Sequence, residues 1–545
     1  MTEQITRQSL INTFFQDPLQ HIVEKTKALL LAGNNEECLN FIEMQPVDLV
    51  ESAPQVLVYK AAAMLFNEYP KQAIEPVLAR AEQFNIPENL KGEITAIRAI
   101  ICSYTDNPSE GIKLSQLALR KIRHENTFFR NIVQRNLGIA YTIKNDLKNA
   151  NQWFEKLLLS SCQLEDLGGI LACYNYLTYI RKVQGCLRSA NIIYKKALDF
   201  IDQHQLDYTP HGIKIISGYG QLLLYWHEVN AAKPYFNKAI ELASETDILY
   251  AYTAYQNLCE AHVREKDIGA AFSVLHELQH RIRGKEDLYE NIHRQHTLAL
   301  EARIFLEAGE IDHAMDWMVS SKIVGLHPND LFSHYGYALG YILPIAANTY
   351  IQSGMYENAV KIIKAVIPNF IHQGANSYLI RALCMLALAY EKLSQHEKAL
   401  NTFQKAITFA EPENNFGDFF FSSHKMLPLL EESIKRETEP EFTKQLINKI
   451  GHKSQQWQAH SPILSSLGLS NRELEVLHLI EKGFTNRQIS SSLHLSTNTI
   501  KTHNLSIYRK LNVNSRNQAV MKARGLGLIA GNQKATGHSY SSSAS

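Results

Sequence analysis

The spacing of small and large apolar residues over about the first 430 residues predicts pairs of antiparallel helices. In the stretch NLGIAYTIKNDLKNANQWFEKLL, Leu137 and Gly138 are followed by Ala150 and Phe154. Small residues at such offsets allow the two helices of a hairpin to touch, and the large residues fill the space between neighbouring hairpins. The stretch LALAYEKLSQHEKALNTFQKAI has the same order of small and large positions.

The pattern recurs, and its offsets resemble those of the tetratricopeptide repeat. The small residue expected in each second helix is Ala73, Gly111, Ala150, Ala190, Ala232, Ala271, Ala314, Ala359 and Ala399. The spacings run from 38 to 45 residues, longer than the usual ~34 residues. About ten such units would stack into a right-handed superhelix, which predicts an all-α fold. The alternative, a helical domain without repeats, would not place small and aromatic residues at fixed offsets.

The repeat pattern ends near residue 432, so the repeats are assigned to residues 1–432. Residues 433–464 are charged and polar, with one short amphipathic piece from Phe442 to Ile450, and are interpreted as a linker. Residues 531–545 are rich in Ser and Gly, which predicts a disordered tail. A separate module of residues 465–530 lies between them.

Four short helices are predicted in this module. Ser470 and Glu473 form a capping box before an apolar run that Gly483 ends. The three helices that follow have their own capping residues, Thr485, Ser496 and Ser515. The tight turn between the second and third helices is typical of helix-turn-helix DNA-binding domains.

The third helix carries donors and small groups on one face, opposite the apolar Ile500 and Ile507. That face consists of Asn498, Lys501, Thr502, Leu505 and Arg509. A lysine can donate to guanine O6 and N7, and threonine and leucine can contact a thymine methyl. Donors at helix starts and flanks suit phosphate oxygens, and here they are Asn486, Ser496, Thr497, Thr499 and Lys510. The pattern predicts binding to double-stranded DNA.

The charge distribution favours the same conclusion. The whole chain has a net charge of +1, but residues 469–529 hold nine Lys and Arg, three Glu and no Asp. This segment therefore carries +6 and the rest of the chain −5. A basic module on a mildly acidic body is expected to contact a polyanion through one end only.

The module resembles the LuxR-type helix-turn-helix family over its full length. The matching signature is Leu469, Arg472, Glu473, Val476, Leu477, Gly483, Asn486, Ile489, Leu493, Ser496, Thr499, Ile500, Lys501, His503, Lys510, Leu511 and Arg516. The resemblance implies that the third helix enters the major groove, with Lys501 and Thr502 on the bases, and that the fourth helix pairs two subunits. Asn471 stands where many members have Pro, and Leu505 where many have a polar or basic residue.

The repeats resemble the superhelical sensor domain of MalT-type activators, beginning with the stretch CLNFIEMQPVDLVESAPQVLVYKAAAMLFNEYPKQAIEPVLARAE. Those activators carry an ATPase module before the repeats, whereas the sequence G-x-x-x-x-G-K-[ST] does not occur in this chain. ATP-driven oligomerisation is therefore not expected here. No βαβ pattern precedes the C-terminal module, so a receiver domain and a lactone-binding domain are not expected either.

The first helix of each unit is expected to line the concave face of the superhelix. The residues predicted there are Arg135, Asn175, Tyr179, Gln221, Gln256, Glu260, Arg303 and Asn348. Amides, an aromatic ring and a few charges suit a small ligand or a protein partner, and the resemblance implies a small inducer. A solvated inner surface without a ligand is the alternative.

Other classes of protein are disfavoured. The chain has no H-E-x-x-H sequence and no nucleophile–base signature, so we do not expect an enzyme, and His503 is interpreted as a packed or phosphate-facing residue. Seven Cys are scattered singly, which is typical of a reducing cytoplasm, and no cofactor or metal is expected. No apolar run is long enough for a membrane span, and we read no signal peptide. The sequence predicts a cytoplasmic transcription regulator, or alternatively a repeat-based adaptor with accessory DNA binding.

Overall fold

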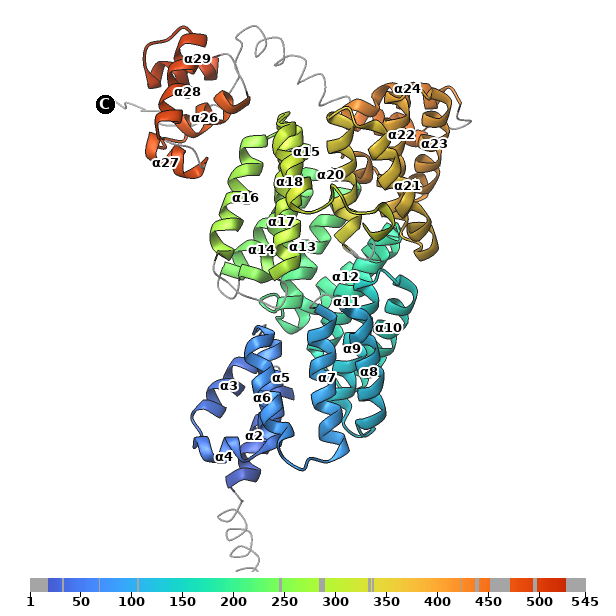
Figure 1. Cartoon of the computed structure of the whole chain (residues 1–545), viewed down its shortest axis with the longest axis vertical. Helices are drawn as coiled ribbons and strands as arrows, with labels where there is room; N and C mark the ends of the chain where they lie inside the picture. Colours follow the sequence, from blue (N-terminus) through green and yellow to red (C-terminus); the bar gives the residue numbers. More distant parts are fainter. Residues whose placement is uncertain are drawn as a thin grey trace, which may run out of the picture.

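The computed structural model is helical throughout the part of the chain that it describes (Figure 1). It describes residues 18–450 and 471–525, apart from gaps at 32–33, 68, 105–106, 245–247, 284–289, 332–334, 336–337, 422, 437–440 and 494–496. None of the helices within those ranges is long and apolar enough to cross a membrane.

The long part of the chain is built from successive helix pairs. It begins with α2 (Pro18–Leu31), α3 (Asn35–Glu43) and α4 (Val47–Glu51). The pairs that follow are α5 (Pro54–Phe66) and α6 (Lys71–Glu82), α7 (Glu88–Tyr104) and α8 (Pro108–Lys121), α9 (Thr127–Ile143) and α10 (Leu147–Gln163), α11 (Leu167–Val183) and α12 (Leu187–His204), α13 (Pro210–Tyr225) and α14 (Val229–Ser244), α15 (Tyr252–Arg264) and α16 (Ile268–Ile282), α17 (Glu290–Ala308) and α18 (Ile311–Ser320), α20 (Leu339–Gln352) and α21 (Tyr356–Gln373), and α22 (Asn376–Lys392) and α23 (His396–Ala410). Short 3₁₀ turns, η1 (Ile248–Ala251) and η2 (Pro328–Asp330), lie between some of them.

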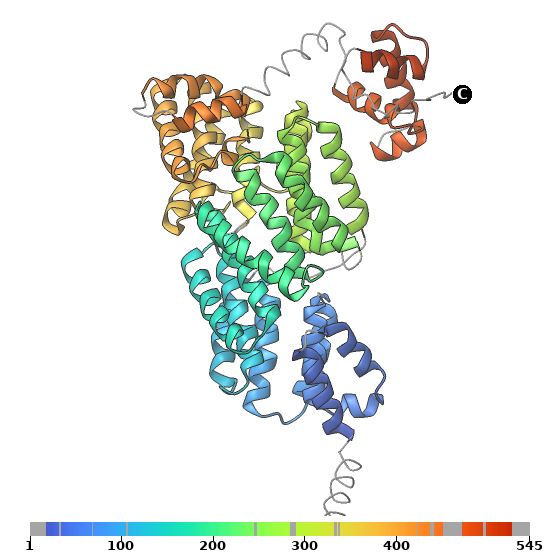
Figure 2. The same ribbon diagram turned by 180° about the vertical axis from the view of Figure 1, so that it is seen from behind.

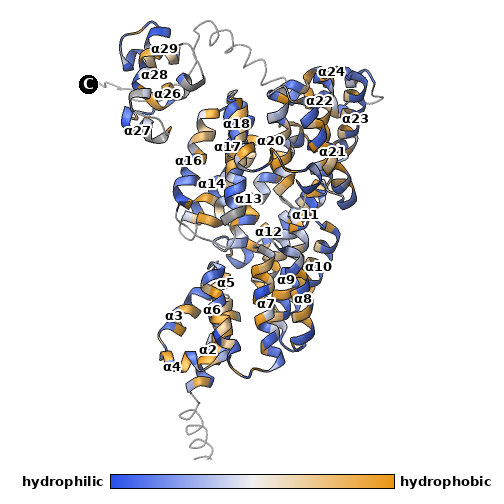
Figure 3. Ribbon diagram, viewed as in Figure 1, coloured by the Kyte–Doolittle hydropathy of each residue, from blue (hydrophilic) through white to orange (hydrophobic). Residues whose placement is uncertain are grey.

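The predicted small residues hold these pairs together. All nine lie in the second helix of a pair, and all but Ala73, which is half-buried, are buried. The first helix supplies a matching small position: a Cβ on Gly138 would lie 2.6 Å from the ring of Phe154, and one on Gly220 would lie 2.7 Å from the ring of Phe236. The predicted all-α repeat architecture is confirmed. Figure 3 shows the hydrophobic and hydrophilic residues alternating around individual helices, as stacked amphipathic pairs require.

The stack of repeats curves until its later units meet its earlier ones. Helix α22 contacts α11, and the Tyr179 and Tyr378 hydroxyls lie 2.9 Å apart although 199 residues separate them in sequence. The backbone N–H of Arg188 donates to Glu413 at 2.8 Å. Figures 1 and 2 both show α21 and α22 beside α11 and α12. Side chains from units far apart in sequence therefore surround one interior.

The chain after α23 folds back into that interior. We call residues 411–426 the return segment; it contains η4 (Glu411–Glu413), η5 (Gly417–Phe419) and η6 (Ser423–Met426) and leads into α24 (Leu427–Ile434). Phe420 of this segment stacks on His227, with ring centroids 3.8 Å apart. The helical stretch 441–450 lies within the predicted linker, and it packs on the return segment, since Phe442 stacks on Phe416 with ring centroids 4.8 Å apart.

The C-terminal module has its own small core. Its helices are α26 (Asn471–Glu481), α27 (Asn486–Ser492), α28 (Thr497–Lys510) and α29 (Arg516–Gly525). The core consists of Val476, Leu477, Ile480, Ile489, Leu493, Ile500, Ile507, Leu511, Ala519 and Ala523. Thr485 and Gln488 form a full capping box at α27, and the Ser515 hydroxyl accepts from the Gln518 N–H at 3.3 Å. The two other predicted caps, Ser470 and Ser496, lie outside the described residues.

Candidate functional sites

Helix α28 presents a continuous exposed face. Its apolar side is sealed, because Ile500, Ile507 and Leu511 are fully buried. On the other side Lys501, Thr502 and Arg509 are exposed, and Leu505 keeps 69% of its surface exposed. An exposed leucine between donors fits a groove that offers thymine methyl groups.

The predicted flanking residues have varied surroundings. Thr497 is exposed and Thr499 half-buried. Asn486 accepts a hydrogen bond from the Asn504 amide at 2.9 Å, which ties α27 to α28. Lys510 forms an ion pair with the buried Glu473 at 2.6 Å, which ties α28 to α26. Ser496 and the side chain of Asn498 lie outside the described residues.

Side chains of several repeats and Phe421 of the return segment line a cavity of about 370 Å³. Five of the eight residues predicted for the concave face line it, namely Asn175, Tyr179, Gln221, Gln256 and Glu260. They come from α11, α13 and α15, the first helices of three successive pairs. The residues predicted on the concave face of these three helices therefore lie together around one cavity.

The other three predicted residues are not among those that line the cavity. The Arg135 guanidinium lies over the ring of Phe66, 5.1 Å from its centroid. Arg303 is 1% exposed and donates to the carbonyl oxygens of Phe420 and Phe421 at 2.9 and 3.2 Å. The amide of Asn348 lies 3.5 Å from the same Phe421 oxygen. The return segment covers Arg303 and Asn348, and the repeat pattern contains no signal for that segment.

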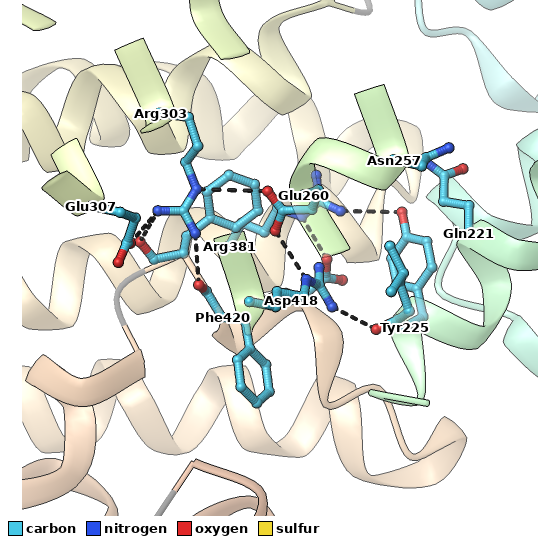
Figure 4. Close-up of polar contacts among 12 residues, drawn as sticks. Gln221, Tyr225, Asn257, Glu260, Arg303, Glu307, Arg381, Asp418 and Phe420 are labelled. Carbon is cyan, nitrogen blue, oxygen red and sulfur yellow. Dashed lines mark hydrogen bonds and ion pairs between the residues drawn. The ribbon is translucent and has the colours of Figure 1, made fainter. Parts of the chain in front are cut away.

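Buried ion pairs border the cavity. Glu260 pairs with Arg264 at 2.9 Å and with Arg303 at 3.8 Å, and Arg381 pairs with Asp418 at 2.5 Å (Figure 4). Burial alone would raise the pKa of Glu307, but Arg303 and Lys266 lower it to about 2. Glu307 therefore remains charged at neutral pH. The ion pairs and the hydrogen bonds of Arg303 join α15, α17, α22 and the return segment into one wall.

Four cationic residues of the cavity lie outside the sequence prediction, namely Lys182, Lys214, Arg264 and Arg381. Lys182 follows Tyr179 by three positions on α11 and so lies on the same face of that helix. Extending the predicted line by one helical turn would have found it. Arg381 comes from α22, and only the closure of the repeat stack brings it to this cavity.

The C-terminal module lies against α16. The Lys482 ammonium is 3.5 Å from the Ser273 hydroxyl, and a second cavity, of about 320 Å³, separates α16 from α26. None of the residues that line this cavity belongs to α28. The exposed face of α28 is therefore not part of this contact.

The fold and the two sites define a helical-repeat protein with an internal cavity and a helix-turn-helix module. Residues 92–436 match the family model of the MalT-like TPR region, and residues 467–523 match that of the bacterial regulatory proteins of the luxR family. The chain belongs to the family defined by the MalT-like TPR region, and its C-terminal module is of the luxR family.

Two similar proteins are both described as HTH-type transcriptional regulator MalT. The one from Serratia proteamaculans (strain 568) is 20% identical over 526 residues, and the one from Yersinia enterocolitica is 21% identical over 526 residues. Each alignment covers 90% of this chain and 56% of the relative, so the chain spans little more than half the length of these relatives. Among solved structures, the TPR domain of P58(IPK) aligns over 73% of this chain and 99% of that chain, with 12% identity and a TM-score of 0.19. A TM-score this low does not support a shared arrangement of repeats.

Proposed function

We propose that this protein is a bacterial DNA-binding transcription regulator whose repeats sense a small ligand. Residues 465–530 form the DNA-binding domain, residues 1–432 form the sensor, and residues 433–464 connect the two. The observation that carries the proposal is the exposed face of α28, with Lys501 and Thr502 opposite a fully buried apolar side in a module of the luxR family.

The chemistry of that face favours base reading over a general surface role. Lys501 can donate to guanine, and Leu505 can contact thymine, while Arg509 and Thr497 can reach phosphate oxygens. Glu473 and Glu481, which could repel phosphate, are 5% and 13% exposed and pair with Lys510 and Arg524. The module therefore presents a basic surface in which these two carboxylates are already neutralised.

The cavity supports the sensing part of the proposal. Its volume of about 370 Å³ falls in the range of small-molecule sites, roughly 300–1,000 Å³. It lies between units that are far apart in sequence, so a bound molecule would contact several of them at once. Occupancy of such a site can change how the units stack, and the contact of α16 with α26 gives a route to the DNA-binding domain.

Pairing of two copies through α29 completes the proposal. Met521 on this helix keeps 74% of its surface exposed, which suits a partner helix in a second copy. Two paired modules would read two half-sites about one helical turn apart.

Genome-wide footprinting of the full chain tests the proposal. We expect protection of a small set of promoter sequences that share a motif, and a log affinity for them that falls linearly as log salt rises. A repeat-based adaptor that has lost base reading would bind DNA without sequence preference, and a chain that protects no shared motif would contradict the proposal.

A further inference from the structure

Lys182 is a buried amine in the cavity wall without a carboxylate partner. It lies near the end of α11 with 5% of its surface exposed. Its ammonium donates to the Gln221 side-chain oxygen and lies 5.5 Å from the centroid of the Tyr194 ring. Among the described residues it forms no ion pair, and burial lowers its pKa to about 7.

The arginines around the same cavity differ from Lys182 in this respect. Each has a carboxylate within ion-pair distance: Arg264 and Arg303 pair with Glu260, and Arg381 pairs with Asp418. A cation taken out of water without a counter-ion is costly. A buried ammonium that lines a cavity of about 370 Å³ and has no counter-ion can be stabilised by an anion that enters the cavity.

The charge balance of the whole cavity points the same way. Four cationic residues line it, Lys182, Lys214, Arg264 and Arg381, and Glu260 is the one carboxylate among the described lining residues. Asp418, behind this lining, neutralises Arg381. Lys214 faces an aromatic ring, with its ammonium 5.9 Å from the centroid of Tyr250. Two amines thus remain without a carboxylate partner among the described residues.

The rest of the lining suits a flat body that carries hydrogen-bonding groups. Eight tyrosines line the cavity and offer ring faces. The amides of Asn175, Gln221, Gln256 and Asn257 offer donors and acceptors, and the Gln221 amide donates to Asn257 at 3.1 Å. Lys182, Gln221 and Asn257 therefore form one polar chain across α11, α13 and α15.

We propose that the cavity binds a small organic anion, with its carboxylate or phosphate group at Lys182 and its ring body between the tyrosines. This inference rests on the proposed function, in which the cavity is the sensor site. The anion would supply the counter-charge that Lys182 lacks and would accept hydrogen bonds from it.

Calorimetric titration of the full chain with matched pairs of probes tests this inference. The pairs are benzoate with benzamide, and phenyl phosphate with phenol, so that each anion has a neutral counterpart with the same ring. We expect at least one anion to bind with a Kd at least tenfold lower than its neutral partner, and the pair that shows the difference identifies carboxylate or phosphate. Failure of both anions to bind tighter than their neutral partners would overturn the inference.

Gln221→Glu is the sharpest variant, because it keeps the shape of the side chain and places a carboxylate on the Lys182 ammonium. We expect the preference for the anion to fall at least tenfold. Gln152→Glu, at an exposed position on α10, adds the same charge outside the cavity and should leave the preference intact. If Gln221→Glu retains the preference, the inference is wrong. Lys182→Met must show the same loss, which covers the case in which Gln221→Glu does not fold.

The outcome is separate from that of the proposed function. If only the neutral probes bind, and Gln221→Glu abolishes their binding, the cavity remains a candidate sensor site. The inference that its ligand is an anion would then be wrong. DNA binding by the full chain is measured without any of these probes, so its failure would be visible independently.

Discussion

Two lysines of α28 illustrate how differently one residue type can be placed on a single helix. Lys501 is exposed on the face opposite the core. Lys510 is held 2.6 Å from Glu473, which is 5% exposed. Both lysines were predicted to contact DNA, and sequence alone could not separate them because the ion pair depends on how α26 crosses α28. Their different environments make Lys501 the better choice for testing base reading.

Lys501→Ala should weaken binding to a cognate site by roughly 1–3 kcal/mol if Lys501 donates to a guanine. Binding to non-specific DNA should change much less, because that binding is the sum of many contacts between basic residues and phosphates, and Lys501 is only one such charge. A mobility-shift titration with cognate and scrambled duplexes measures both. Lys522→Ala, which removes an exposed charge from α29, is the control. Equal losses for both variants at the cognate site would remove Lys501 from the reading face.

Glu93 is a buried carboxyl that gives stability a pH dependence. It is 1% exposed in α7, and burial raises its pKa to about 7 although the amides of Asn89 and Asn126 each donate to it at 2.7 Å. In the unfolded chain its pKa is near the ordinary value of about 4.3. The folded state therefore holds the proton more tightly, and stability falls as pH rises from about 4.3 to about 7.

Glu93→Gln should consequently raise the free energy of unfolding at pH 8 by about 3–4 kcal/mol, because it removes the cost of a buried charge. Near pH 4 the variant and the wild type should unfold alike, since Glu93 is then mostly protonated in both the folded and the unfolded state. Urea unfolding at the two pH values measures the difference. Glu125→Gln, at an exposed position, should show no pH-dependent gain, and a gain from Glu93→Gln that is equal at both pH values would contradict the explanation.

At the scale of elements, the sequence specified the helix pairs well because each pair depends on local contacts. The small residues occur at fixed offsets, and the capping box of Thr485 and Gln488 marks the start of α27. The packing of the stretch 441–450 was harder to predict. Its apolar face was visible in the sequence, but its packing on Phe416 depends on the return segment, which has no repeat signature. Local pattern predicts the elements, and long-range packing decides which apolar faces find a partner.

Gly138 tests the contact within a helix pair. A Cβ at this position would lie 2.6 Å from the Phe154 ring, so Gly138→Ala should lower the free energy of unfolding by roughly 1–3 kcal/mol through overpacking. The same change at Gly168, where the nearest atom would lie 3.7 Å away, should be neutral or stabilising by up to ~1 kcal/mol. Thermal unfolding of both variants measures this. If Gly138→Ala is no less stable than Gly168→Ala, the close helix contact does not hold the pair together.

At the scale of the molecule, the closure of the repeat stack creates the cavity. Tyr179 and Tyr378 belong to units far apart in sequence and meet hydroxyl to hydroxyl. Whether such units meet depends on small rotations that add up over several repeats. No single repeat contains that information, which explains why five cavity residues could be predicted from α11, α13 and α15 whereas Arg381 could not.

The ion pair of Arg381 and Asp418 fastens this closed arrangement. Asp418 is fully buried in the return segment and accepts hydrogen bonds from Ser377 and Asn415, both at 2.6 Å, as well as from Arg381. Arg381 also donates to the Tyr225 hydroxyl at 3.2 Å, which connects α22 to α13. The loss of one partner would leave a buried charge without its counter-charge.

Asp418→Ala should therefore lower the free energy of unfolding by about 3–5 kcal/mol, and Arg381→Met should have a similar cost. The double variant should cost clearly less than the sum of the two, because neither charge is then left alone. Glu397→Ala breaks the pair with Arg436, whose side chains are 71% and 38% exposed, and it should cost no more than about 1 kcal/mol. Denaturant unfolding of the four variants completes the cycle. Additive costs for Asp418→Ala and Arg381→Met would show that the two charges are not coupled, and that the ion pair does not fasten the return segment.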